Sequence, residues 1–139
     1  MINISKDAAR RFVETWTGRG HERSESQTFW YQLLHDVFGI DTPANFVKYE
    51  LPVRLKNAKF IDAYIPSTKV IIEQKSSTED LRKAKKQSDK EELTPYEQAL
   101  RYSTGLKYSE RPRWIVTCNF TSFLIYDMEK PNGEPFEIK

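Results

Sequence analysis

The chain has 139 residues, of which 38% are hydrophobic and 13% aromatic, so it can bury one core, and a wholly disordered chain is excluded. The 22 basic and 20 acidic residues leave a net charge of only +2, so any surface that binds phosphate must be local. The single cysteine, Cys118, excludes an internal disulfide and fits a reducing cytoplasm. No segment approaches the ~20 apolar residues that cross a bilayer, so we expect a cytoplasmic protein without a membrane partner.

The first forty residues predict two amphipathic helices. Apolar residues at helical spacing begin after Ser5 and stop at Gly18, and a second apolar stripe runs from about 22–24 to Phe38. Ser24 and Gln27 have the spacing of a capping box, which would place Glu22 before the second helix.

The middle of the chain changes to the two-residue period of strands. Segments 47–53, 60–65 and 70–75 predict three strands, the last two joined by a turn at 66–69. A two-residue loop at Ser67-Thr68 would set the register so that Asp62 directly opposes Glu73. One face of this hairpin would then carry Phe60, Asp62, Tyr64, Ile71, Glu73 and Lys75, and the other Ile61, Ala63, Ile65, Val70, Ile72 and Gln74.

The second half predicts a helix between further strands. The charged segment 79–92 is expected to be a solvated helix or a mobile loop. Thr94, Pro95 and Glu97 predict a capped helix that ends near Gly105. Strands are expected at 114–118, 123–126 and, after an Asn132-Gly133 turn, 135–139. This order predicts an α/β domain in which a right-handed crossover joins two parallel strands.

The predicted hairpin places two carboxylates opposite each other. Like charges at this separation repel, and the pKa of one would rise unless a cation neutralised them. Mg²⁺ prefers carboxylate oxygens, and Lys75 on the same face could act on a bound water or a phosphate. The alternative is a surface hairpin whose acidic pair is solvated, but the apolar neighbours Phe60, Tyr64 and Ile71 favour a metal site.

Ile61-Asp62 and Glu73-Gln74-Lys75 resemble the PD-(D/E)xK nuclease signature, with Ile61 where a proline often stands. Four longer segments, 29–34, 61–75, 93–99 and 111–120, are similar to the N-terminal region of MmeI-like restriction–modification proteins. The resemblance implies a restriction-endonuclease-like fold with a central mixed sheet and flanking helices. It also implies that residues 1–139 are a single nuclease domain, an N-terminal fragment of a longer protein. The chain's end inside an apparent strand fits either such a cut or a frayed terminus.

The resemblance also implies residue roles. Asp62 and Glu73 would bind the metal, the Gln74 carbonyl would add a ligand, and Lys75 would assist the attacking water. The resemblance adds two more groups of candidate site residues. Gln98 and Tyr102 match a QxxxY element that would orient Lys75 or contact a phosphate, or they are ordinary residues of a helix face. Either Glu22 or Glu25 would be a helical metal ligand or only an acidic residue at a helix N-terminus.

The implied function is metal-dependent endonuclease activity on double-stranded DNA in a prokaryotic cytoplasm, with Mg²⁺, or Mn²⁺ in its place, and with transient self-association to cut both strands. S-adenosylmethionine would be bound only by a C-terminal methyltransferase part outside this chain. Two alternatives remain, a DNA-binding module that has lost catalysis and a methyltransferase within the chain. The second is disfavoured because the five glycines form no glycine-rich loop. The basic residues of segment 79–92, Arg82, Lys83, Lys85 and Lys86, could contact phosphates or could simply be solvated.

Overall fold

The computed structural model describes residues 6–55, 58–86, 92–130 and 133–139, without the side chains of Glu22, Arg23, Arg54, Ala58 and Lys86. Its N-terminal part consists of helices α1 (Lys6–Trp16) and α2 (Glu22–Gln32), a π-helix η1 (Leu33–Val37) that continues α2, and the short α3 (Pro43–Phe46). The two predicted helices are therefore confirmed, and the π-helical end of the second is an addition.

Helix α2 begins earlier than its capping signal predicted. Its N-cap is His21, whose Nδ1 accepts a hydrogen bond from the main-chain N–H of Ser24. The predicted capping box of Ser24 and Gln27 is wrong, because the imidazole of His21 already binds one of the free N–H groups at the helix start. Glu22 is consequently the first residue of the helix.

A six-stranded sheet forms the centre of the molecule. Its order is β1 (Lys48–Arg54), β2 (Ala58–Ile65), β3 (Val70–Gln74), β6 (Trp114–Cys118), β7 (Phe123–Asp127) and β8 (Phe136–Ile138). Strands β3 and β6 pair in parallel, and the other neighbouring pairs are antiparallel. The connection from β3 to β6 contains α4 (Pro95–Ser103) and, after it, the 3-10 helix η2 (Tyr108–Glu110), which confirms the predicted crossover between parallel strands.

The charged segment before α4 is extended where the structure describes it. Strands β4 (Lys85–Lys86) and β5 (Glu92–Leu93) form a separate antiparallel pair. The alternative of a solvated helix is therefore wrong for the described residues of 79–92, because the flanks of this segment pair with each other instead of continuing α4.

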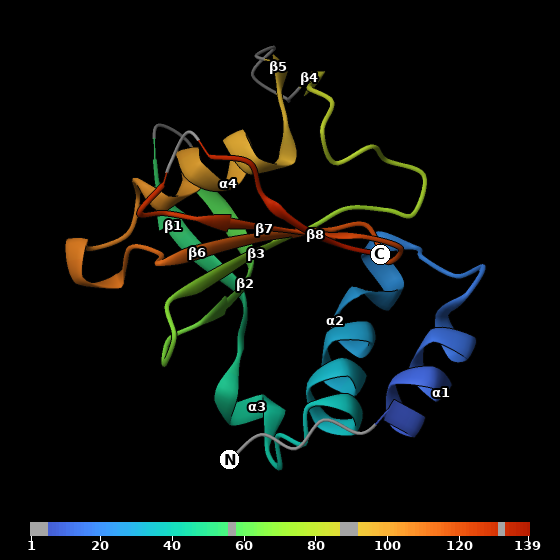
Figure 1. Cartoon of the computed structure of the whole chain (residues 1–139). Coiled ribbons are helices and arrows are strands. Elements are labelled where there is room, and N and C mark those ends of the chain that lie inside the picture. Colours follow the sequence, from blue (N-terminus) through green and yellow to red (C-terminus); the bar gives the residue numbers. More distant parts are fainter. Residues whose placement is uncertain (1–5, 56–57, 87–91, 131–132) are drawn as a thin grey trace.

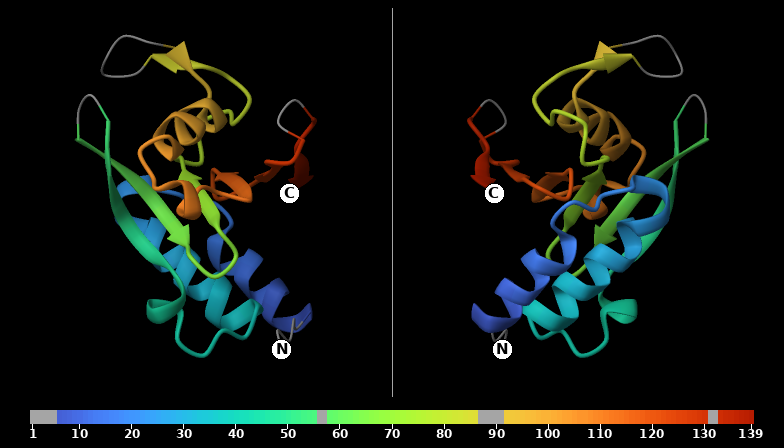
Figure 2. Two further views of the ribbon diagram at one scale, coloured as in Figure 1. Left: turned by 90° about the vertical axis from the view of Figure 1, so that its left-hand side faces the viewer. Right: turned by 90° about the vertical axis from the view of Figure 1, so that its right-hand side faces the viewer.

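Helices cover both faces of the sheet (Figures 1 and 2). On one face α1, α2 and η1 bury a cluster around Phe29, Trp30 and Leu34, into which Ala63 and Ile72 of the sheet point. On the other face Ala99 of α4 packs against a second set of sheet residues: Val53, Ile61, Tyr64, Ile71 and Ile115. This three-layer arrangement around a mixed sheet confirms the predicted α/β class and is consistent with a restriction-endonuclease-like fold.

The predicted register of the central hairpin is confirmed for three pairs: Ala63 with Ile72, Tyr64 with Ile71 and Ile65 with Val70. The ladder ends there, so the predicted opposition of Asp62 and Glu73 is not part of it. The predicted faces hold from Ala63 onward, but Ile61 packs on the α4 face with Tyr64 and Ile71 and not on the face of Ala63. That assignment is wrong because β2 turns over at Asp62.

Candidate active site

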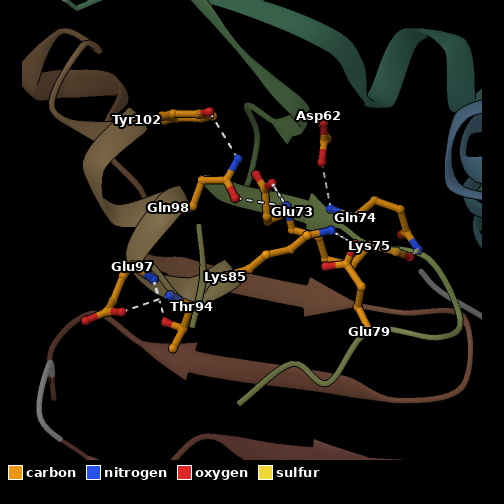
Figure 3. A network of polar contacts seen from close by, with 10 residues as sticks. All are labelled: Asp62, Glu73, Gln74, Lys75, Glu79, Lys85, Thr94, Glu97, Gln98 and Tyr102. Atoms are coloured by element: carbon orange, nitrogen blue, oxygen red, sulfur yellow. Dashed lines mark hydrogen bonds and ion pairs between the residues drawn. The ribbon is translucent and has the colours of Figure 1, made fainter. Parts of the chain in front are cut away.

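The end of β3 places three consecutive side chains on alternate sides of the sheet. Glu73 is 3% exposed and Gln74 is 1% exposed. The indole N–H of Trp30 in α2 donates to Gln74 Oε1 at 2.6 Å, so Gln74 points to one helical layer. Glu73 and Lys75 point toward α4 on the other side (Figure 3). Beyond the strand, the main-chain N–H of Lys75 donates to the carbonyl of Cys118 at 2.7 Å, which keeps Lys75 aligned with the sheet.

A buried ammonium group connects this strand to α4. Lys75 Nζ lies 3.2 Å from Glu73 Oε2 and donates to Gln98 Oε1 at 2.9 Å. Gln98 Nε2 in turn donates to the Tyr102 hydroxyl at 3.0 Å (Figure 3). Only 13% of the Lys75 side chain is exposed, so these contacts replace much of its hydration and hold its charge in one place.

Helix α4 is anchored directly before Gln98. The Thr94 hydroxyl accepts from the Glu97 N–H at 3.1 Å, and Glu97 Oε1 accepts from the Thr94 N–H at 2.9 Å. This is the predicted capping box, which is confirmed. Because Gln98 is the next residue after Glu97, the cap also fixes the amide that binds Lys75.

Asp62 joins the site through the main chain of β3. Its Oδ2 accepts a hydrogen bond of 2.7 Å from the N–H of Gln74. The paired residues of β2 and β3 end at Ala63 and Ile72, so the Asp62 carboxylate takes the place of a main-chain acceptor one step further along. Asp62, Glu73 and Lys75 are thus brought to the same end of the sheet.

The oxygen donors at this end suit a hard cation. The carboxylates of Asp62 and Glu73 and the main-chain carbonyl of Gln74 are ligand types that Mg²⁺ accepts, and Mg²⁺ commonly takes only one or two carboxylates and fills its shell with water and phosphate. Among the described residues, no three His, Cys, Asp or Glu side chains gather into a metal-binding group. The protein would therefore supply only part of the coordination shell.

The two helical glutamates are placed differently. Glu25 Oε2 binds the guanidinium of Arg19 at 2.8 Å, and its Oε1 accepts from the His21 N–H at 3.1 Å. The hydrogen bond from His21, followed by that from Arg19, lowers the pKa of Glu25. Both carboxylate oxygens of Glu25 are therefore bound to residues of the turn between α1 and α2. The side chain of Glu22 lies outside the described part of the chain, so its metal-binding role stays a prediction.

Trp30 is a site residue that the sequence did not reveal. It belongs to the apolar stripe of α2, and its indole N–H needs a partner when buried. Gln74 was the one polar residue predicted on the apolar face of the hairpin. A buried indole N–H and a buried amide each need a hydrogen-bond partner, so the sequence offered a signal for the contact between Trp30 and Gln74.

The cations of the charged segment are largely bound to acids where the structure describes them. Arg82 contacts Glu134 at 3.4 Å and Glu137 at 3.2 Å, and Lys85 contacts Glu79 at 3.1 Å. Lys83 is exposed, and the side chain of Lys86 lies outside the description. Their contact with phosphates stays a prediction.

Comparison with known proteins places the chain in a family. The family model described as "MmeI, N-terminal domain" matches residues 7–138. No curated protein and no solved structure matches the chain. In the described part of the chain, no helix is long and apolar enough to cross a membrane.

Proposed function

We propose a function for this chain, which belongs to the family of MmeI N-terminal domains. The proposed function is that of a metal-dependent endonuclease domain that hydrolyses phosphodiester bonds of double-stranded DNA. The observation that supports this most directly is the buried ion pair of Glu73 and Lys75, bound to Gln98 and lying at the same sheet end as Asp62. Strongly desolvated charges held in one geometry are typical of functional sites.

In this proposal Asp62 and Glu73 hold Mg²⁺, or Mn²⁺ in its place, with the Gln74 carbonyl as a further ligand. When bound, the cation supplies Lewis-acid stabilisation of the charge on the phosphate oxygens. The main-chain N–H of Gln74 orients the Asp62 carboxylate by donating to its Oδ2. Glu25 is left out of this ligand set because Arg19 and His21 bind its oxygens.

Lys75 is the proposed catalytic residue beside these ligands. Gln98 and Glu73 hold its ammonium, which can donate a hydrogen bond to the attacking water and to the phosphate as negative charge develops there. The water oxygen forms a new bond to phosphorus and gives up a proton to solvent, the bridging P–O bond on the opposite side breaks, and the leaving oxygen takes up a proton from solvent. Gln98 and Tyr102 are positioning residues, since they act through Lys75.

We further propose the context that the family resemblance implies. The domain would belong to a single-chain restriction enzyme that is also an adenine-N6 DNA methyltransferase, with S-adenosylmethionine bound outside this chain. Cutting both strands would require two such domains to meet on DNA. Prokaryotic cytoplasm is the compartment that fits this system.

Calorimetric titration with Mn²⁺, together with plasmid cleavage by the protein that carries this domain, tests the proposal. We expect Asp62→Asn and Glu73→Gln to remove the Mn²⁺ binding heat and cleavage. Lys75→Gln should keep Mn²⁺ binding but lower the cleavage rate by about 10²- to 10³-fold, the usual range for removing one hydrogen-bond donor to developing negative charge.

Glu14→Gln is the matched control, because Glu14 is an exposed residue of α1. It should bind Mn²⁺ and cleave as the wild type does. If wild type and Glu73→Gln give the same Mn²⁺ titration, the chain is instead a module without a working metal site, the alternative left open by the sequence.

A further inference from the structure

Strands β1 and β2 change faces at the same point. In a regular strand, residues two apart lie on one face. Tyr49 and Ala63 pack with the α1–α2 layer, whereas Leu51 and Ile61, each two residues away, pack with the α4 layer. Tyr49 pairs with Ala63 and Leu51 pairs with Ile61, so both strands turn over together.

The reversal is centred on Glu50 and Asp62, both of which the structure describes. The pairing of β1 with β2 keeps one register on either side but omits these two residues from the ladder. Glu50 has φ +50, a left-handed conformation that is uncommon for residues other than glycine and asparagine. A left-handed residue inside a strand rotates the chain beyond it, so it accounts for the change of face in β1 and in its partner.

This rotation determines where the Asp62 carboxylate lies. A side chain in a regular strand stands above or below the sheet. The Asp62 carboxylate instead reaches along the sheet to β3, where Oδ2 accepts from the Gln74 N–H at 2.7 Å. Gln74 is 1% exposed, and a buried N–H of this kind requires an acceptor.

We propose that Glu50 is a positioning residue for Asp62: its left-handed backbone turns β2 so that the Asp62 carboxylate meets the Gln74 N–H at the sheet end. The link to metal binding rests on the proposed function, whereas the link between Glu50 and Asp62 does not. The Glu50 side chain is exposed, so its backbone conformation, not its carboxylate, carries this role.

Substitutions at position 50 should differ in how well they keep Asp62 in place, according to how readily each residue adopts positive φ. Glycine and asparagine adopt positive φ readily, alanine does so less well, and the β-branched valine does so least. Glu50→Gly and Glu50→Asn should therefore keep Asp62 in place, although both remove the charge. Glu50→Val should displace it. Lys48→Val is the matched control, because Lys48 is an exposed residue of the same strand where a β-branched side chain is favourable.

The first measurement is the NMR signal of the Gln74 amide in the metal-free chain. In wild type, Glu50→Gly, Glu50→Asn and Lys48→Val, this amide should show the slow hydrogen exchange of an N–H that donates to an acceptor. In Glu50→Val that protection should be lost. If the valine variant does not fold, Glu50→Ala gives the same comparison with a smaller loss of protection.

The second measurement is Mn²⁺ affinity by calorimetry. Glu50→Val should weaken it about 10- to 100-fold, the effect typical of removing a group that orients a metal ligand, and the glycine and asparagine variants should match wild type. An unchanged Gln74 amide in Glu50→Val overturns the proposal, as does an equal loss in Glu50→Gly. If the amide responds as expected but wild type binds no Mn²⁺, the positioning role stands and the proposed function fails.

Discussion

At the scale of single residues, Gln98 binds the ammonium group of Lys75 directly. It accepts from Lys75 and donates to Tyr102. Gln98→Leu should lower the free energy of unfolding by about 1.5–3 kcal/mol, because a hydrogen bond to a charged group is lost and the ammonium stays buried. Tyr102→Phe leaves the contact between Gln98 and Lys75 intact and should cost only about 0.5–1.5 kcal/mol. Urea denaturation of both variants measures the difference.

The exposed Gln27 of α2 provides a matched control. Gln27→Leu makes the same chemical change on a surface helix and should stay within about 0.5 kcal/mol of wild type. Equal losses for Gln98→Leu and Tyr102→Phe would contradict the view that the contact with Lys75 dominates.

Much of the site followed from residue patterns, because a short turn sets the register of a hairpin. That register brought Asp62, Glu73 and Lys75 together, and helical spacing placed Gln98 next to Tyr102. The orientation of Asp62 could not be predicted, since it depends on the positive φ of Glu50 on a neighbouring strand. No composition rule marks a glutamate for that conformation.

Among the secondary-structure elements, α4 connects stability to the site through its N-terminal cap. Thr94→Val should lower the free energy of unfolding by about 1 kcal/mol, because the valine cannot accept from the Glu97 N–H. Thr94→Ser keeps a hydroxyl acceptor and should lose much less. Guanidinium denaturation of the three proteins checks this order.

Thr28→Val on the exposed surface of α2 is the control for this exchange, because it replaces the same side chain away from a helix end. It should be near neutral. A loss in Thr28→Val as large as that in Thr94→Val would mean that the exchange itself, not the cap, causes the effect.

Elements with strong local signals were predicted well, and those decided by tertiary pairing were not. The cap of α4, the strands of the central hairpin and the crossover all matched their patterns. The β4–β5 pair was missed because two-residue strands carry too little periodicity to distinguish them from a charged loop. The cap of α2 was missed because it is a histidine, which ranks outside the usual N-cap residues.

At the scale of the whole molecule, the stability of the core between the sheet and the N-terminal helices is linked to pH through Cys118. It is fully buried in the cluster that contains Trp30, Ala63 and Ile72. Burial raises the pKa of its thiol to about 12, whereas an unfolded chain ionises its cysteine near pH 8.5. Between these values the folded state holds a proton that the unfolded state has lost, so stability is complete at lower pH and declines as the pH rises.

Denaturation at a series of pH values from about 8 to 10 tests this linkage. The free energy of unfolding of the wild type should fall with pH, with a slope that approaches about 1.4 kcal/mol per pH unit from this group alone. Cys118→Ala loses some packing at every pH, but its slope should be shallower because the titrating thiol is gone.

The range stops near pH 10 because burial raises the pKa values of Tyr49, Tyr64, Tyr96 and Tyr126 as well, and unfolded tyrosines begin to ionise there. Equal slopes in the two proteins would mean that the thiol ionises in the folded state, and hence that this core opens to water without global unfolding.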